Sequence, residues 1–518
     1  MYSQFTRRRQ TLHTDMYHQY TIEEIRREIH TERICENGTV LPPVIAVRFE
    51  DYLINDNTLE VSYAEEAESI DNLATDRNAS ENRIIECSVL SEKIVAYDKE
   101  TVLSEEFDPM QEENSAYRPF FASFMIKADR ETQARISKLE YAWYGAYFYP
   151  LEKADDHTDL FSPERYITTD AVFQFSASPG FSLEGKLVIV PEKKDIIYGG
   201  VHINKSYDTL YDADRFEGDP DEKVREELQG LWKKDALRTV EIYNVGQGNA
   251  NYLRCGKNRV LFDIGYPIKS VPAKNPLYYR RALLAIRQAK PSVVVLSNWD
   301  FDHYAGWVYA NTEIFNVPWI APTLYHRGYK KRNRTATSIG TNAYRLASYL
   351  KKKQLLMLLD WKDVPRTVAS LGGQGKQVIG LEMGGFGSGD WDIALRNRHG
   401  LYFTIADENG HANTVLAADV PYSSMRDGII GDALQILHVP HHCSKMKLDA
   451  IEKPGLSALK TAILSAERGM EYDLHRIKLE KCFGSSNMIF TTDQHKDNET
   501  LAVEIQFNAM GPVKTGTR

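Results

Sequence analysis

The sequence predicts two parts of different fold class, a β-rich α+β N-terminal half and an α/β layered C-terminal half. Residues 41–205 read mostly as short apolar strands between polar turns, whereas from residue 238 onward apolar strand runs alternate with segments of helical spacing. The charge divides in the same way. Residues 1–235 have 27 basic and 47 acidic residues (net −20), and the remainder has 36 and 25 (net +11). Opposite signs indicate two domains with different partners.

The domain boundaries follow from these patterns. We expect an acidic accessory domain at 1–205, an acidic linker leading into a helix at 206–237, and a second domain at 238–518. No apolar run has the length of a membrane span, and the first residues lack an apolar signal core. The five cysteines are scattered without paired spacing, which suits a reducing compartment. We therefore predict a cytoplasmic protein without a membrane partner.

The N-terminal half opens with a helix at 21–32, where Thr21 and Glu24 have the spacing of a capping box. Its predicted strands are 42–53, 82–90, 92–98, 171–178 and 186–192. The segment 128–148 starts with helical and ends with aromatic character. The sequence does not indicate an activity for this half, and we expect a regulatory or targeting domain with a protein partner.

The C-terminal half has a more regular rhythm of strands and helices. The predicted strands lie within 238–255, 258–266, 291–297, 317–322, 400–407, 413–419, 434–440, 460–466 and 487–493. The helical spacing falls at 275–290 and at 341–359. The uninterrupted apolar run at 291–297 is typical of a strand that is covered on both faces.

Three of these strands end in side chains that can ligate a metal. They are Asn298, Asp300, Asp302 and His303 after the first, Asp419 after the second, and His441 and His442 after the third. Carboxylate oxygens and imidazole nitrogens suit Zn, Mn or Fe. His438, inside its strand, is expected to be structural. Asp263 and His399 are expected to support the ligands, and for His475 a supporting role and direct ligation both stay open.

These residues carry a resemblance to a known family. The segments "NVGQGNANYL", "LFDIG", "SNWDFDHYAGW", "NRHGLYFTI…TVLAAD" and "LHVPHHCS" occur in the order of five motifs of the metallo-β-lactamase fold, and "FTTDQHKD" approximates a sixth. Over residues 238–510 the chain most resembles the nuclease domain of bacterial competence DNA-uptake proteins. The resemblance implies a four-layer αββα fold and hydrolysis of phosphodiesters.

Three positions depart from the family pattern. Asn298 stands in place of a metal-binding His, Asn249 in place of an Asp, and Cys443 in place of a Gly. A neutral amide oxygen suits Mg or Mn better than Zn. The sequence leaves open an active enzyme with a one-metal or hard-metal site, or a decayed site kept as a scaffold. The retained ligands favour activity.

The resemblance assigns roles to the site residues. Asp302, His303, Asp419 and one of His441 or His442 are expected to hold one or two divalent ions, Mn, Mg or Zn. Asp300 and Asn298 are expected to complete a weaker second site or to orient the water.

A basic loop at 325–334 is expected to bind a nucleic-acid backbone. Its charged residues are Arg327, Lys330, Lys331, Arg332 and Arg334.

The leading hypothesis is a metal-dependent nuclease with an N-terminal regulatory domain, of a kind that serves in bacterial stress or phage defence. The alternatives are hydrolysis of a small phosphodiester such as a cyclic nucleotide, and an interaction protein whose metal site has lost its chemistry.

Overall fold

The computed structural model divides into two compact units. Unit 1 comprises Met1–Asp212 and Gly340–Lys353, and unit 2 comprises Ala213–Ile339 and Gln354–Arg518. The structure describes residues 45–49, 83–108, 122–136, 138–139, 142–151, 161–175, 182–208, 216–232, 237–243, 245, 248–265, 288, 290–309, 312–324, 340–372, 377–385, 395–407, 409–444, 446, 448, 460–465, 473–483, 488–491, 502–508 and 511–517. The predicted helices at 21–32 and 275–290 and the basic loop at 325–334 lie outside this part, apart from residues 288 and 290.

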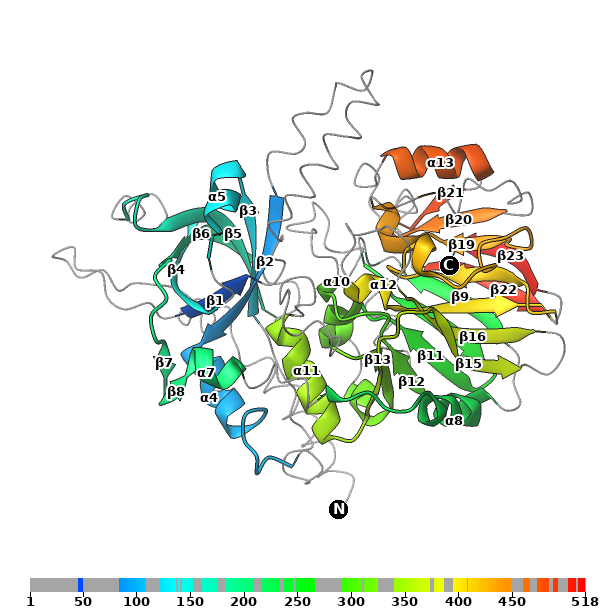
Figure 1. Cartoon of the computed structure of the whole chain (residues 1–518), viewed down its shortest axis with the longest axis horizontal. Helices are drawn as coiled ribbons and strands as arrows, with labels where there is room; N and C mark the ends of the chain where they lie inside the picture. Colours follow the sequence, from blue (N-terminus) through cyan, green and yellow to red (C-terminus); the bar gives the residue numbers. More distant parts are fainter. Residues whose placement is uncertain are drawn as a thin grey trace, which may run out of the picture. The chain divides into compact units, whose positions relative to one another are not determined.

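Unit 1 is built on a closed six-stranded barrel in the order β1-β2-β3-β5-β6-β4 (Figure 1). Its strands are β1 (Ile45–Phe49), β2 (Arg83–Ser91), β3 (Ala122–Ala128), β4 (Tyr144–Pro150), β5 (Ile167–Phe175) and β6 (Ser182–Ile189). Successive side chains of a strand point to opposite faces. Tyr144 and Phe148 of β4 belong to the main core of this unit, whereas Tyr147 and Tyr149 pack with Phe161 in a second cluster.

The predicted strand at 92–98 is wrong, because the structure places helix α4 (Glu92–Glu100) there. Ser91 caps this helix, and its hydroxyl accepts a hydrogen bond from the Ile94 N–H at 3.2 Å. The adjacent Ile94 and Val95 suggested a strand, but with Asp98 they form one buried helical face. The described residues of this stretch also form helices α5 (Arg130–Ile136) and α7 (Ile203–Asp208), and a short hairpin of β7 (Ile197–Tyr198) and β8 (Val201–His202).

Helix α11 (Thr341–Lys352) belongs to unit 1 although it lies in the second half of the sequence. Fully buried Arg345 donates two hydrogen bonds of 2.8 Å to the carboxylate of Asp98, which also accepts one from Tyr207 at 2.6 Å. The helical spacing at 341–359 therefore predicted too long a helix. The chain leaves the helix at Lys353, and Gln354 follows with a left-handed φ of 56°.

Unit 2 contains an eight-stranded and a seven-stranded sheet. The first has the order β14 (Leu356–Leu359), β13 (Trp319–Pro322), β12 (Val293–Val295), β11 (Asn258–Phe262), β10 (Asn251–Cys255), β9 (Leu237–Tyr243), β22 (Ala502–Asn508) and β23 (Gly511–Thr517). The second has the order β15 (Arg366–Gly372), β16 (Val378–Met383), β17 (Leu401–Ala406), β18 (Ala412–Leu416), β19 (Ile436–His438), β20 (Thr461–Leu464) and β21 (Met488–Phe490). Strands β11 to β14 and β18 to β21 run parallel within their sheets.

One apolar core joins the two sheets of unit 2. Val240 and Phe262 of the first sheet and Leu381 and Phe403 of the second belong to it, and the rings of Phe262 and Phe403 meet edge to face at 4.9 Å. Burial of each such side chain contributes about 1.5–3 kcal/mol. This packing positions the ends of the parallel strands, which carry the candidate site. Unit 2 is thus a mixed, sheet-rich α/β structure.

Two helices of unit 2 contact strands of the seven-stranded sheet. Helix α8 (Asp221–Trp232) buries Val224 and Leu228, which are spaced by one turn, and its first residue Asp221 pairs with Arg366 of β15 at 2.8 Å. Helix α13 (Asp473–Phe483) buries Leu479 in a cluster shared with β20. The predicted four-layer arrangement stays a prediction, as do the predicted domain boundaries.

Within the part of the chain that the structure describes, no helix has the length and apolar character to cross a membrane.

Candidate metal centre

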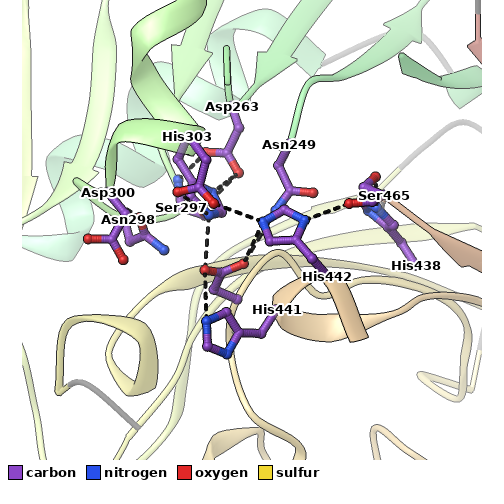
Figure 2. Close-up of polar contacts among 12 residues, drawn as sticks. Asn249, Asp263, Ser297, Asn298, Asp300, His303, His438, His441, His442 and Ser465 are labelled. Carbon is purple, nitrogen blue, oxygen red and sulfur yellow. Dashed lines mark hydrogen bonds and ion pairs between the residues drawn. The ribbon is translucent and has the colours of Figure 1, made fainter. Parts of the chain in front are cut away.

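The candidate site forms where strands of unit 2 end. Asp263 follows β11, the segment 297–303 follows β12, and Asp419 follows β18. Asp302 and His303 of this segment belong to the short helix α10 (Phe301–Tyr304). The pair His441–His442 follows β19, and Ser465 follows β20. Since β11 and β12 run parallel, as do β18, β19 and β20, these residues emerge from the carboxyl ends of neighbouring strands. Figure 2 shows the resulting cluster.

Asp263 fixes the loop that follows β12. One carboxylate oxygen accepts a hydrogen bond from the Ser297 N–H at 2.6 Å, and the other accepts one from the Ser297 hydroxyl at 2.7 Å. That second oxygen also lies 2.9 Å from Nδ1 of His303. Asp263 and His303 are fully buried. This contact holds the proton of His303 on Nδ1 and leaves Nε2 as the free ligand atom.

Close backbone contacts hold the other side of this loop. The Asn249 N–H donates to the Asp302 carbonyl at 3.1 Å, and the Ile264 N–H donates to the His303 carbonyl at 2.8 Å. A Cβ atom at Gly265 would lie 1.8 Å from the Asp302 carbonyl oxygen and 2.8 Å or less from the Asn249 backbone. Position 265 therefore requires glycine for the loop to approach this closely.

His441 and His442 lie in a strained turn. Their φ angles are 49° and 53°, and Cys443 follows with 60°, so three successive residues with a Cβ adopt the left-handed conformation. Glycine adopts this conformation without strain, whereas Cys443 and the two histidines each have a Cβ atom. Such strain persists where surrounding structure imposes it, and it concentrates at functional sites. Here it turns His442 inward, 3% exposed, and leaves the side chain of His441 30% exposed.

Four side chains converge at the centre of the cluster. Nε2 of His303 lies 3.1 Å from an oxygen of Asp419, and Nε2 of His442 lies 3.2 Å from an oxygen of Asp302. Neither nitrogen has the alignment of a hydrogen bond with any described residue. One ligand atom from each of Asp302, His303 and His442 lies within 4.8 Å of the other two. Buried nitrogens and oxygens that approach without hydrogen-bond alignment fit donors that share one divalent ion.

The other ring nitrogen of His442 is held from outside the cluster. Nδ1 lies 2.8 Å from the Ser465 carbonyl oxygen (Figure 2), so this nitrogen carries the proton and Nε2 stays available. The imidazoles of His303 and His442 are thus both oriented by a contact at Nδ1. Asp419 lies 3.9 Å from Nε2 of the more exposed His441 and accepts a 3.5 Å contact from the Asn249 amide.

The charges of the cluster stabilise one another. Burial opposes the charge on His303, but the carboxylates of Asp419 and Asp263 outweigh it and raise its pKa well above 6.5. Burial also opposes ionisation of Asp419, but His303 and His441 hold its pKa far below 3.8. In the same way, burial disfavours the charged form of Asp302, and His303 with His442 nevertheless lowers its pKa. Without an ion, a proton on His303 balances part of the carboxylate charge.

The side-chain oxygens of Asn298 and Asp300 are not directed at the three-residue ligand group. The Asn298 side-chain oxygen accepts a hydrogen bond from the Asp300 N–H at 2.8 Å. Asn298 is 1% exposed, and its amide nitrogen has no hydrogen-bond partner among the described residues. Figure 2 shows this nitrogen pointing toward the cluster, whereas the Asp300 carboxylate points away from it.

His475 and His399, which the sequence suggested as supporting residues, have contacts outside the ligand group. Nε2 of His475 lies 3.1 Å from the Tyr422 hydroxyl, and its Nδ1 lies 3.1 Å from the Ser444 carbonyl oxygen. Burial lowers the pKa of His475 to about 4. The ring of His399 stacks on Trp361, with centroids 5.0 Å apart.

His438, expected to be structural, contacts the Ser465 hydroxyl at 2.7 Å. Its burial lowers its pKa to about 3.

The sequence did not indicate a role for Ser297 or Ser465. The Ser297 hydroxyl lies 2.9 Å from Nδ1 of His303, and the Ser465 carbonyl oxygen lies 2.8 Å from Nδ1 of His442, so both residues position an imidazole of the site. Both directly follow the apolar run of a parallel strand, and that location was the available signal. The five basic residues predicted to bind substrate lie outside the described residues.

Comparisons with known proteins give distant structural likenesses. No family model and no curated protein matches the chain. Among solved structures, a diphosphatase from the PhnP family is similar at 11% identity and a TM-score of 0.28, covering 53% of this chain and 99% of that chain. The metallo-β-lactamase fold protein YhfI from Bacillus subtilis is similar at 13% identity and a TM-score of 0.28, covering 49% and 96%. At these identities and TM-scores the likenesses assign no activity to this chain.

Proposed function

We propose that this chain is a metal-dependent hydrolase of phosphodiesters, and specifically a nuclease. The observation that carries this proposal is the convergence of Asp302, His303 and His442, fully or almost fully buried, on strand ends of unit 2. Two imidazoles and a carboxylate are a donor set for Zn or Mn. Asp419 adds a second carboxylate at the same place.

In this proposal each residue has one task. Asp302, His303 and His442 hold the ion, and Asp419 completes its surroundings. Asp263 keeps the proton of His303 on Nδ1, and the Ser465 carbonyl does the same for His442. A bound divalent ion supplies a nucleophilic water at neutral pH and compensates the charge that develops on a phosphate.

Two properties of the sequence favour a phosphodiester as substrate. The ordered motifs from Asn244 to Ser444 resemble those of the competence-type nuclease branch. Residues 236–518 also have a net charge of +11, which favours a polyanion. We assign unit 1 a regulatory or targeting role that involves a protein partner. For the whole chain we propose a role in bacterial stress or phage defence.

The test is cleavage of plasmid and single-stranded DNA by the full chain with Mn²⁺, Mg²⁺ or Zn²⁺. We expect metal-dependent cleavage by the wild type and a loss of at least about 100-fold in Asp302→Ala, since the variant lacks a ligand of the ion. Asp363→Asn, which removes an exposed carboxylate of unit 2, serves as the matched control and should keep the activity.

Two results would change the assignment. Cleavage of dinucleotides or cyclic nucleotides but not of DNA or RNA would point to a small phosphodiester as substrate. No hydrolysis by the wild type, together with no retained metal, would refute the enzyme and leave an interaction protein.

A further inference from the structure

Asn298 offers a hydrogen-bond donor at a place where the related pattern has a metal-binding His. The carboxamide of Asn298 has only one orientation compatible with its surroundings. Its oxygen faces the Asp300 N–H at 2.8 Å, and the reversed amide would place two donors against each other. The NH₂ group is therefore the end of the side chain that is left to contact other groups. It cannot ligate a cation, because an amide nitrogen has no available lone pair.

This NH₂ group is buried without a partner. Asn298 is 1% exposed, and its nitrogen forms no hydrogen bond with any residue that the structure describes. Figure 2 shows it directed toward the ligand cluster. A buried, unsatisfied donor costs about 1–3 kcal/mol, so its retention suggests that another group satisfies it during function.

The backbone holds Asn298 firmly at this place. Its neighbour Ser297 donates two hydrogen bonds to Asp263, and Trp299 donates to the Pro322 carbonyl at 2.8 Å. Asp300 cannot supply the missing ligand either, since its carboxylate points away from the cluster. The two residues that could hold a second ion are thus Asn298, which offers a hydrogen-bond donor, and Asp300, whose carboxylate points away. Neither offers a ligand atom for a second ion.

We propose that the centre holds one ion, and that the Asn298 NH₂ group binds a nonbridging phosphoryl oxygen of the substrate in place of a second ion. This inference rests on the proposed function and specifies it further. The ion binds from the side of Asp302, His303 and His442. The substrate class is a phosphate ester whose anionic oxygens accept a hydrogen bond from Asn298. Asn298 is a substrate-binding residue and contributes no metal ligand.

The experiment measures metal content and anion binding, without relying on turnover. The full-length wild type, Asn298→Ala and Asn298→Asp are loaded with one or more equivalents of Mn²⁺, dialysed, and analysed for metal by mass spectrometry. Inorganic phosphate is then titrated calorimetrically into each protein carrying one equivalent. Asn413→Ala is the matched control, because it removes another buried amide of unit 2 whose oxygen accepts a bond from the Thr414 hydroxyl.

We expect one ion in the wild type and in Asn298→Ala, with phosphate affinity reduced about 10- to 100-fold in the variant, the range for a hydrogen bond to a charged group. The control should keep both values. Asn298→Asp preserves the acceptor for the Asp300 N–H. If the alanine variant does not fold, this second variant tests whether Asn298 binds the phosphate. At one equivalent of Mn²⁺ its phosphate affinity should fall at least as far, because a carboxylate repels the anion.

Three outcomes would overturn the proposal. Two ions in the wild type that fall to one in Asn298→Ala would make Asn298 a metal ligand. One ion throughout, with phosphate affinity unchanged within threefold, would leave a metal hydrolase in which Asn298 does not bind substrate. No retained ion in the wild type would instead refute the proposed function, and this inference with it.

Discussion

The contact between Asp263 and His303 can be tested by Asp263→Asn. This substitution keeps the shape of the side chain, and asparagine tolerates the left-handed φ of 59° at this position. The Ser297 N–H is a fixed donor and keeps the amide oxygen on its side. The amide NH₂ group then faces Nδ1 of His303, 2.9 Å away in the wild type. Nδ1 of His303 then loses its carboxylate acceptor and keeps only the Ser297 hydroxyl, 2.9 Å away, as an acceptor for its proton. The substitution therefore weakens the preference for a proton on Nδ1 and favours a proton on Nε2, the atom directed at the ion.

The expected effect is a loss of metal affinity. Removal of a carboxylate that orients a metal-binding His typically weakens binding about 10- to 100-fold. This factor corresponds to about 1.4–2.8 kcal/mol. We place Asp263→Asn in this range and not beyond it, because Asp302 and His442 still contribute their ligand atoms.

The measurement is a competition titration of Mn²⁺ or Zn²⁺ against a chromophoric chelator at constant pH. Asp363→Asn is the control, since it removes one exposed carboxylate of the same unit. Circular dichroism checks that both variants fold. Metal affinity that stays within threefold of the wild type in a folded Asp263→Asn variant would refute the assignment of His303 as a ligand oriented by Asp263.

Three further predictions concern protons, buried charge and close packing. Metal binding should release at least one proton near pH 7, because the carboxylates raise the pKa of His303 and the ion must displace the proton on its Nε2. The metal affinity should therefore fall as the pH falls. Calorimetry in buffers of different ionisation enthalpy measures the number of protons released. Arg345→Ala should destabilise unit 1 by about 3–5 kcal/mol in chemical denaturation, because it leaves the carboxylate of Asp98 buried without its cation; a loss below about 1 kcal/mol would contradict this. Gly265→Ala should abolish stoichiometric metal binding, because its Cβ atom collides with the backbone of Asp302 and Asn249. The Cβ atom of Gly230→Ala in α8 meets nothing within 4 Å, so this variant should stabilise the fold by about 0.5–1 kcal/mol in thermal melts.

The location of many strands could be read from local sequence. The Val run at 293–295, the apolar alternation around Leu401–Ala406 and the runs before Asp419 and His438 all form strands. These signals are local because a strand buried on one or both faces needs apolar residues at fixed spacing. Where the local signal was short, it misled. At 92–98 the helix cap of Ser91 outweighed two adjacent β-branched residues.

The choice between His441 and His442 depended on the tertiary structure. The sequence offers two identical side chains in succession, and only the left-handed turn directs one to the Ser465 carbonyl and leaves the other partly exposed. That turn is held by the contact of the His441 N–H with the Ala418 carbonyl, more than twenty residues away in the chain. Local propensity cannot predict this left-handed conformation, because residues with a Cβ atom disfavour it.

The sequence by itself therefore determined which residue types stand at the strand ends, and with them the kind of ligand the site can offer. Only the tertiary structure decided which of those atoms meet, because the sheets of unit 2 bring the ends of β11, β12, β18 and β19 to one cluster. It also decided the place of Arg345 in unit 1, through the buried carboxylate of Asp98. These contacts join residues by geometry and burial, which the order of side chains along a chain does not contain.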